Sequence, residues 1–226
     1  MNFGIEGKRI VVTQADEFMG PAICAVLEGQ GAIVRKHFGS LTDAQAATNL
    51  IAQSGDINIL IANLALPAPS TRVQETTEEE WQEVFDVLVH PLPRLVRAVL
   101  PQMMERRFGK IIVIGSASAL RGINRASTYS AARGAQLAYV QAIGVELAPH
   151  NIQVNAIAQN FVDNPTYFPP EVQANPRFQE RLKREVPLGR LVAAEEDAAM
   201  VAYLCSDAAN CFVGQIFPVA GGWAIR

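Results

Sequence analysis

Three polar side chains have the types and spacing needed for acid–base chemistry on a small substrate: Ser116, Tyr129 and Arg133. Ser116 follows the glycine that ends an apolar run, and the carboxyl ends of parallel strands are where ligands bind. Tyr129 and Arg133 are four residues apart in a helical pattern, so their side chains share one face. A fixed guanidinium beside a phenol favours the phenolate, which makes Tyr129 a candidate general base near neutral pH.

Each of these residues also has an ordinary structural explanation when it is taken alone. Ser116 could cap a turn, Tyr129 could lie on a helix surface, and Arg133 could pair with a carboxylate. The three residue types together, at the required spacing, favour one catalytic constellation over three unrelated structural roles.

The chain that must position these residues alternates short apolar runs with longer amphipathic stretches, which is typical of parallel strands joined by helices. We predict strands at residues 9–13, 32–36, 57–62, 109–115, 152–157 and 215–219. We predict helices at residues 20–28, 43–53, 127–148 and 194–206, and a helical region at 78–106 that Pro91 and Pro93 interrupt. Residues 165–185 are interpreted as an irregular excursion that forms a lid on the substrate side. The pattern indicates one α/β domain over residues 1–226, a Rossmann-like doubly wound parallel sheet with helices on both faces.

The composition argues against several classes of partner. The 226 residues are 18% charged with a formal net charge of −3, so the basic excess of a nucleic-acid-binding protein is missing. No apolar run approaches the roughly 20 residues of a membrane-spanning helix, and residues 1–4 lack the charged and apolar regions of a signal peptide. We therefore expect a cytoplasmic protein without membrane contact. Cys24, Cys205 and Cys211 lack metal-ligand spacing, so we expect free thiols and no metal site.

Several motifs around the candidate residues are similar to those of the short-chain dehydrogenase/reductase superfamily, over essentially the whole chain. They are Asn63 in the sequence LIANLA, GSAS at 115–118, Tyr129 thirteen residues after Ser116, NIQVNAIA at 151–158, PLGRL at 187–191, and GQIFPVAGGW near the C-terminus. The resemblance implies the dinucleotide-type α/β fold of that superfamily.

The departures from that superfamily remove groups that hold or use a nicotinamide cofactor. The phosphate-binding loop after the first predicted strand keeps only Gly20 and carries Asp16, Glu17 and Phe18. The two acids and the bulky ring oppose a pyrophosphate by like charge and by size. The usual Tyr-x-x-x-Lys is Tyr-x-x-x-Arg in this chain, the assisting asparagine aligns with Leu88, and the Pro-Gly after the fifth strand is replaced by Gln-Asn-Phe.

These losses, with the Ser-Tyr-Arg set retained, resemble the halohydrin dehalogenases, which are cofactor-free relatives of the dehydrogenases. The resemblance implies that Ser116 binds the oxygen of a haloalcohol, and that Tyr129, with help from Arg133, removes its proton while halide leaves and an epoxide closes. It also implies the reverse opening of epoxides by halide and other small anions, without a cofactor, and a homotetramer assembled through the helical regions 78–106 and 127–148. The residues expected to line the halide and substrate pocket are Phe18, Ser118, Gln159, Asn160, Phe161, Val162, Tyr167 and Phe168.

Alternatives stay open at this point. Arg35 and Lys36 at the end of the second strand suit a 2′-phosphate, so an NADP-dependent reductase with an atypical loop is one alternative. A non-catalytic relative is another. Phe18 fits a core plug as well as a pocket wall, and Gln159 and Asn160 fit loop hydrogen bonding as well as halide binding.

Overall fold

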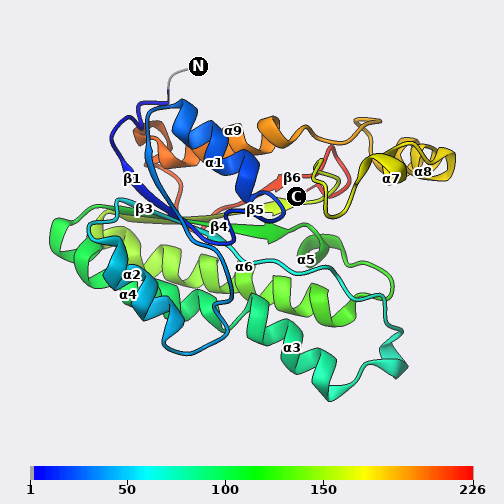
Figure 1. Cartoon of the computed structure of the whole chain (residues 1–226), viewed down its shortest axis with the longest axis horizontal. Helices are drawn as coiled ribbons and strands as arrows, with labels where there is room; N and C mark the ends of the chain where they lie inside the picture. Colours follow the sequence, from blue (N-terminus) through cyan, green and yellow to red (C-terminus); the bar gives the residue numbers. More distant parts are fainter. Residues whose placement is uncertain (1–2, 226) are drawn as a thin grey trace.

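Six parallel strands form the sheet at the centre of the computed structural model, which describes residues 3–225 (Figure 1). The strands are β1 (Arg9–Val12), β2 (Ile33–Lys36), β3 (Ile59–Asn63), β4 (Gly109–Ser116), β5 (Ile152–Gln159) and β6 (Ile216–Val219). Their order across the sheet is β2-β1-β3-β4-β5-β6, and every neighbouring pair is parallel. The predicted Rossmann-like sheet in one domain is confirmed, and the predicted strand ends differ from the observed ones by at most two residues.

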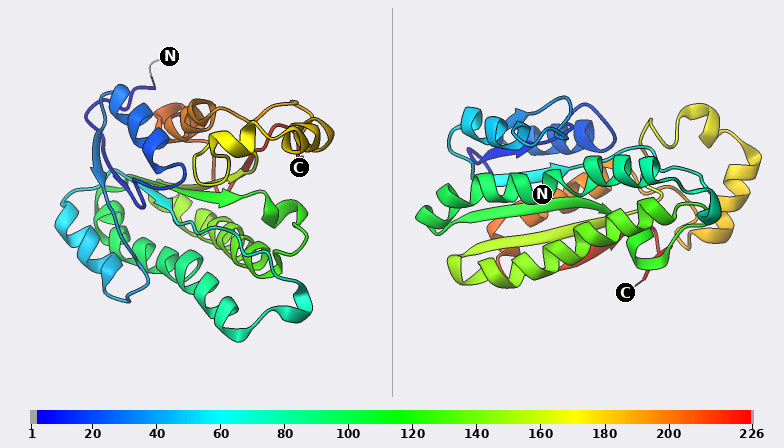
Figure 2. Two further views of the ribbon diagram at one scale, coloured as in Figure 1. Left: turned by 45° about the vertical axis from the view of Figure 1, so that its right-hand side comes forward. Right: turned by 90° about the horizontal axis from the view of Figure 1, so that it is seen from below.

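Helices cover both faces of this sheet, as the views in Figures 1 and 2 show. On one face, α1 (Gly20–Gly29) packs against α9 (Ala194–Cys205). The other face carries α2 (Ala46–Ser54), α4 (Pro91–Arg106) and α6 (Ser127–Leu147), and α3 (Glu78–Leu88) packs on α6. The connections contain α5 (Ser118–Arg121) and three short 3-10 turns, η1 (Val73–Glu75), η2 (Ala148–His150) and η3 (Asp207–Ala209).

The alternation of side chains along the strands builds a hydrophobic core on each face of the sheet. Leu60 and Ile111 pack with side chains of α2, α4 and α6, whereas their neighbours Ile59 and Ile112 pack with side chains of α1 and α9. Because both faces are covered, β3 and β4 are buried along their whole length. The last residues of β3, β4 and β5 are polar. They are Asn63, Ser116 and Gln159, and they meet at the carboxyl edge of the sheet.

The predicted helical region at 78–106 divides in two, as its prolines indicated. Pro91 and Pro93 lie in the first turn of α4, where a missing backbone N–H is tolerated. The break allows α3 to leave the direction of α4 and to pack on the N-terminal part of α6. Thr128 Oγ1 of α6 donates a hydrogen bond to Glu80 Oε1 of α3 over 2.9 Å, which joins the two helices.

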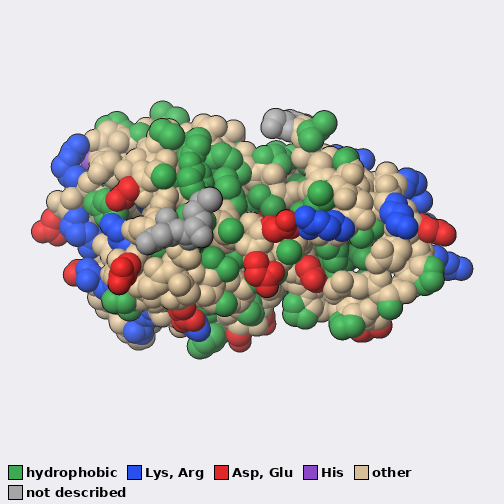
Figure 3. Space-filling model, turned by 90° about the horizontal axis from the view of Figure 1, so that it is seen from above, with side chains coloured by type: hydrophobic (Ala, Val, Ile, Leu, Met, Phe, Trp, Pro, Cys, Tyr) green, Lys and Arg blue, Asp and Glu red, His purple; other side chains and the backbone are tan. Residues whose placement is uncertain are grey.

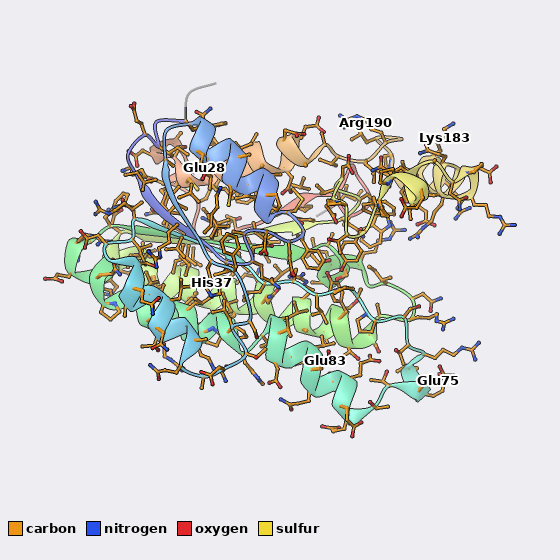
Figure 4. The ribbon with its side chains drawn as sticks, in the orientation of Figure 1. Glu28, His37, Glu75, Glu83, Lys183 and Arg190 are labelled. Carbon is orange, nitrogen blue, oxygen red and sulfur yellow. The ribbon has the colours of Figure 1, made fainter. Side chains whose placement is uncertain are left out.

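The excursion at 165–185 is more regular than we expected. It contains α7 (Pro170–Gln173) and α8 (Pro176–Glu185), so the prediction of an irregular segment was wrong. Most residues of α8 are charged, and its apolar side chains Phe178 and Leu182, four residues apart, form the one face that packs on the core. Both helices lie beyond the carboxyl ends of the strands (Figure 2), and Lys183 points outward from α8 (Figure 4).

The described part of the chain has neither a membrane span nor a cluster of metal ligands. Within residues 3–225, no helix has the length and apolar character needed to cross a membrane, and no group of His, Cys, Asp and Glu side chains could hold a metal ion. The three cysteines are free thiols, as we expected; Cys24 and Cys205 are buried and Cys211 is exposed.

Candidate functional site

A cavity of about 360 Å³ opens at the carboxyl edge of the sheet, where polar residues end β3, β4 and β5. It borders the loops after β1 and β3, between which the strand order reverses, and open α/β sheets bind ligands at that position. The other walls come from the ends of β4 and β5, from α6 and from the excursion. Most of the site residues expected from the sequence line this cavity: Phe18, Ser116, Tyr129, Arg133, Gln159, Asn160, Phe161, Val162, Tyr167 and Phe168.

Ser116 ends β4, and its hydroxyl oxygen is already used as an acceptor. The backbone N–H of Ser118 donates to Ser116 Oγ over 3.2 Å, and hydrogen bonding between the Ser116 hydroxyl and Tyr129 helps to lower the pKa of that phenol. The parallel register pairs Ser116 with Gln159, so the ends of β4 and β5 place both residues at one wall of the cavity. The hydroxyl of Ser116 therefore lies at the cavity wall beside Tyr129.

Tyr129 and Arg133 reach the cavity from the first two turns of α6. Both are buried, at 5% and 4% exposure, and the guanidinium carbon lies 5.1 Å from the centroid of the tyrosine ring. Nη1 of Arg133 donates to the backbone oxygens of Leu64 (2.9 Å) and Ile114 (3.0 Å) and to Oε1 of Gln136 (2.9 Å). These bonds hold the guanidinium at the ends of β3 and β4, so its charge stays beside the phenol.

The surroundings of Tyr129 favour its phenolate. Burial raises the pKa of Tyr129, but the charge of Arg133 and hydrogen bonding with Arg133, Tyr167 and Ser116 lower it by more. The net result is a pKa below the ordinary value of 10.0, in the direction expected from the four-residue spacing. A buried phenol of this kind can act as a general base closer to neutral pH than a free tyrosine can.

Tyr167 brings a second phenol against the first. Its hydroxyl accepts a hydrogen bond from the N–H of Ala68 (3.1 Å) and donates one to the carbonyl of Leu66 (2.9 Å), which ties the excursion to the loop after β3. Burial and the neighbouring Tyr129 raise the pKa of Tyr167 well above its ordinary value, so this phenol stays protonated. Its one proton has two acceptors within reach, the Leu66 carbonyl and the oxygen of Tyr129.

Phe18 forms a wall of the cavity from the loop after β1. Its backbone has a positive φ of 48°, and its ring centroid lies 5.7 Å from that of Tyr167. Asn63 fixes this loop, because its Nδ2 donates to the carbonyls of Gln14 (3.0 Å) and Glu17 (3.3 Å). Phe18 lines the cavity and belongs to none of the hydrophobic core clusters, so of the two alternatives for this ring the structure favours the pocket wall.

The turn after β5 supplies a second polar wall. Gln159 donates through Nε2 to Oδ2 of Asp197 (2.7 Å), and Oδ1 of Asn160 accepts the backbone N–H of Phe161 (2.9 Å). Both amides line the cavity and both also bond within the protein, which is the internal hydrogen bonding that the sequence offered as one of two alternatives. Phe161 and Val162 add apolar surface to the same wall.

Ser118 does not line the cavity, which corrects the expectation from the sequence. It begins α5, its side chain is buried, and its Oγ has no hydrogen-bond partner among residues 3–225. Because the side chain packs into the protein at the helix start, the contact of Ser118 with the site passes through its backbone N–H to Ser116.

Asp197 and Arg181 are among the residues of the site that were not anticipated from the sequence. Asp197, in the first turn of α9, is buried behind Gln159, and burial raises its pKa to about 7 against the hydrogen bond from that glutamine. Its helical spacing from buried Val201 is the signal that could have marked it as inward-facing. Arg181 of α8 also lines the cavity, with its guanidinium carbon 5.5 Å from the centroid of the Phe161 ring. No sequence signal marks Arg181, because its place depends on how the excursion folds.

A comparison with known families shows which family this chain belongs to. A family model described as enoyl-(acyl carrier protein) reductase matches residues 2–224. The chain belongs to the short-chain dehydrogenase/reductase family.

Two similar curated members of that family are reductases by name. Human dehydrogenase/reductase SDR family member 4 is 28% identical over 225 residues, which cover 98% of this chain and 80% of the relative. The 3-oxoacyl-[acyl-carrier-protein] reductase FabG of Escherichia coli is 29% identical over 247 residues, which cover 98% of each chain.

Two similar solved structures of short-chain dehydrogenase/reductase fold carry descriptions of a different chemistry. A protein described as a dehalogenation enzyme superposes with a TM-score of 0.90 at 31% identity, covering 97% of this chain and 99% of its own. Halohydrin dehalogenase HheC, bound to ethyl (2S)-oxiran-2-ylacetate, superposes with a TM-score of 0.89 at 27% identity, covering 97% of this chain and 98% of its own. The proteins that this chain resembles therefore include both reductases and dehalogenases. The residues of its own site are needed to choose between these two activities.

The residues of this chain do not fit the nicotinamide dinucleotide of the short-chain reductases. In the loop after β1, the N–H groups of Ala15, Glu17 and Gly20 donate to backbone carbonyls of the protein over 3.0, 3.3 and 2.8 Å, so these donors are not free for a pyrophosphate. Asp16 and Glu17 line a neighbouring cavity of about 280 Å³, where their carboxylates would repel phosphate. Phe18, the next residue of this loop, lines the larger cavity of about 360 Å³.

Proposed function

We propose that this protein converts vicinal haloalcohols to epoxides with release of halide and a proton, without a nicotinamide cofactor, and that it catalyses the reverse opening of epoxides by small anions. The observation that carries the proposal is the meeting of Ser116, Tyr129 and Arg133 in one cavity beside a loop that does not fit a dinucleotide. The likeness to a dehalogenation enzyme and to a halohydrin dehalogenase supports the same activity.

Proton transfer is the task of Tyr129 in this reaction. Ser116 donates a hydrogen bond to the hydroxyl oxygen of the substrate, and the phenolate of Tyr129 removes the hydroxyl proton. The freed oxygen attacks the neighbouring carbon: a C–O bond forms, the carbon–halogen bond breaks, and halide leaves with the electron pair. Tyr129 then loses its proton to water, so the products are an epoxide, a halide ion and one proton. Arg133 acts through Tyr129 by holding its pKa down.

The leaving anion needs hydrogen-bond donors in surroundings that contain little water. The amides of Gln159 and Asn160 and the aromatic edges of Phe18 and Phe161 supply such a place in a cavity whose walls are mostly apolar. In Figure 3, Lys and Arg side chains lie at both ends of the molecule, with Asp and Glu side chains among them. Arg181 lines the cavity, and its Nε lies 3.1 Å from Oε2 of Glu185, so a carboxylate already pairs its charge.

Halide release tests the proposal directly. Purified protein is incubated with 1,3-dichloro-2-propanol without added cofactor, and free chloride is recorded for wild type, Tyr129→Phe and Tyr139→Phe. Tyr139 is a half-buried tyrosine of the same helix that does not line the cavity, so it is the matched control. We expect chloride release by wild type and by Tyr139→Phe. Release by wild type that is no faster than release by Tyr129→Phe contradicts the proposal.

Nicotinamide-dependent reduction is the second candidate, favoured by the names of the curated relatives and by the basic residues of β2. Arg35 and Lys36 are exposed, and Nζ of Lys36 lies 2.9 Å from Oε1 of Glu28, which already pairs its charge. A titration of NADPH followed by its fluorescence separates the two candidates. We expect no saturation at micromolar concentrations, and saturable binding there would favour the reductase.

We also propose the homotetramer that the resemblance implies, built through α3, α4 and α6. These helices leave large apolar side chains in water: Trp81 is 40% exposed, Met104 is 38% exposed and Val145 is 71% exposed. Burial of such residues against copies of the chain would remove their contact with water. Light scattering after size-exclusion chromatography should give four times the chain mass of 24.5 kDa, and a mass of one chain would contradict the assembly.

A further inference from the structure

A buried carboxyl group lies directly behind the cavity wall. Asp197 is 0% exposed, and its Oδ2 accepts the hydrogen bond from Nε2 of Gln159 over 2.7 Å. Its Oδ1 has no hydrogen-bond partner among residues 3–225. The helix that carries it, α9, packs in the apolar core shared with α1. A half-satisfied carboxylate is costly in such surroundings, and uptake of a proton relieves that cost.

No cation among residues 3–225 is paired with Asp197. The titratable groups on its own helix, on the elements packed against α9 and on the adjoining loops are Glu195, Glu196, Tyr203, Cys205, Cys24, Glu28, Lys110, Asp207, Asp163 and Arg190. Arg190 pairs with Glu196 (2.7 Å), and Lys110 Nζ bonds to Asn210 (2.7 Å). Burial raises the pKa of Asp197 to about 7, and the hydrogen bond from Gln159 is what opposes it.

The protonation state of Asp197 decides which end of the Gln159 amide faces it. A carboxylate only accepts hydrogen bonds, so it must receive an N–H of Gln159, as in the 2.7 Å contact. A carboxylic acid can instead donate its proton to Oε1 of Gln159, which turns both amide N–H groups away from the carboxyl and toward the cavity. When Asp197 is ionised, one N–H of Gln159 faces the cavity with a negative charge behind it. When Asp197 is neutral, two N–H groups of Gln159 face the cavity without that charge.

We propose that Asp197 positions Gln159 for anion binding and makes that binding depend on a proton: the neutral pair binds halide and the ionised pair releases it. The inference rests on the proposed dehalogenation and deepens it, because that reaction releases a halide and a proton together. At acid pH the protein therefore binds the anion that epoxide opening consumes together with a proton. At alkaline pH it releases the halide that epoxide closure produces.

Bromide binding without turnover isolates this effect. Sodium bromide is titrated calorimetrically between about pH 5.5 and about pH 8.5 into the Tyr129→Phe protein, which lacks the other titrating group that faces the anion. We expect a nearly constant dissociation constant below pH 7, and above it a rise that approaches tenfold per pH unit. Adding Asp197→Asn to this background keeps a neutral donor beside Gln159. The dissociation constant of that double variant should keep its acid value across the whole range.

Asp163→Asn is the matched control. Asp163 also accepts a hydrogen bond from a glutamine, through Gln173 Nε2 over 2.8 Å, but neither residue lines the cavity. In the same background this control should keep the pH dependence, whereas Gln159→Leu should weaken bromide binding about tenfold at acid pH and remove its pH dependence.

The outcomes separate this inference from the proposed function. The same pH dependence with and without the carboxyl of Asp197 overturns the inference, and so does a protein that binds no bromide at any pH. Chloride release by wild type is measured on its own. Intact chloride release without proton-linked bromide binding therefore refutes only the role of Asp197, whereas loss of both measurements refutes the dehalogenase as well.

Discussion

Two regions of the cavity differ in what they do with their polar groups. In the loop after β1, backbone N–H groups and the amide of Asn63 bond to the protein itself, and Phe18 lines the cavity in front of them. In the region formed by β4 and α6, Ser116 and the fixed Arg133 lie beside Tyr129 and lower the pKa of its phenol. The first region uses these polar groups within the protein, whereas the second directs its polar groups at a phenol in the cavity wall.

Under the proposed function, this chain has lost the fit to a dinucleotide in one region and retained the acid–base residues in the other. The two regions come from different βα units that meet only at the carboxyl edge of the sheet, so the loop after β1 can change while β4 and α6 stay in place. Arg133 is anchored at the ends of β3 and β4 by its hydrogen bonds to the carbonyls of Leu64 and Ile114. It stands where the dehydrogenases that the sequence resembles carry a lysine.

The largest loss should follow removal of the phenol from the β4–α6 region. Tyr129→Phe keeps the buried ring but removes the base, so the rate of chloride release should fall about 10²- to 10⁴-fold. The thermal unfolding temperature, measured by circular dichroism, should change little because the hydroxyl contributes little packing. A variant that keeps more than about a tenth of the wild-type rate would show that another group removes the proton.

Replacing Arg133 should have the next largest effect, about 10- to 100-fold at pH 7. Arg133→Gln removes the charge that lowers the pKa of Tyr129, so that pKa rises. Because the phenolate is the active form, the rising limb of the pH–rate profile should move to higher pH, and activity should recover in alkaline buffer. Arg133→Lys keeps a positive charge on this side chain, so it should shift the profile less than Arg133→Gln does. An unshifted profile in Arg133→Gln would assign the arginine a structural role alone.

The grouping of Ser116, Tyr129 and Arg133 at one cavity could be predicted from the sequence because it depends on short spacings. An apolar run that ends in Gly-Ser predicts the end of a strand, and a four-residue spacing places Tyr129 and Arg133 on one helical face. The same holds for the strands, whose apolar runs are visible one by one. Ser118 shows where short spacing fails, since it is two residues from Ser116 and its side chain still packs into the protein.

The rest of the site depends on contacts between residues that are far apart along the chain. Gln159 and Asp197 are 38 residues apart, and the hydroxyl of Tyr167 bonds to a carbonyl 101 residues away. In the sequence, Asp197 is the third acid of a helix start and resembles its exposed neighbours Glu195 and Glu196. Only the packing of α9 on α1 shows that the third acid is buried while the other two are not.

Opening the loop after β1 tests the other side of the comparison. Phe18→Gly removes a cavity wall and the ring contact with Tyr167, so KM for the haloalcohol should rise about tenfold. NADPH should still fail to bind, because the carboxylates of Asp16 and Glu17 remain. The backbone N–H groups of Ala15, Glu17 and Gly20 also still donate to carbonyls of the protein. Saturable NADPH binding by this variant, in a fluorescence titration at micromolar concentrations, would show that a single ring had excluded the cofactor.

Tyr167→Phe should give a smaller loss, about three- to tenfold at pH 7. The substitution keeps the ring but removes the hydroxyl that bonds to Leu66 and Ala68 and helps to lower the pKa of Tyr129. The loss should therefore shrink as the pH rises above the new pKa of Tyr129. Tyr203→Phe, in α9 and outside the cavity, is the control and should match wild type at every pH. A loss in Tyr167→Phe that is the same at all pH values would limit Tyr167 to holding the excursion in place.

The smallest effect on the chemistry, and a clear one on stability, should come from the carboxyl behind Gln159. The pKa of Asp197 is about 7 in the folded protein and near its ordinary value of 3.8 in the unfolded chain, so folding takes up a proton between these values. The stability linked to this proton is fully present below pH 3.8 and is lost as the pH rises through 7. Urea unfolding of wild type should therefore lose on the order of 2 to 3 kcal/mol between pH 5 and pH 8 through this group. Asp197→Asn should remove that contribution to the slope, and Asp163→Asn, which leaves Asp197 in place, should keep it. Equal slopes in all three proteins would place Asp197 in contact with water and leave Gln159 without its proton-dependent partner.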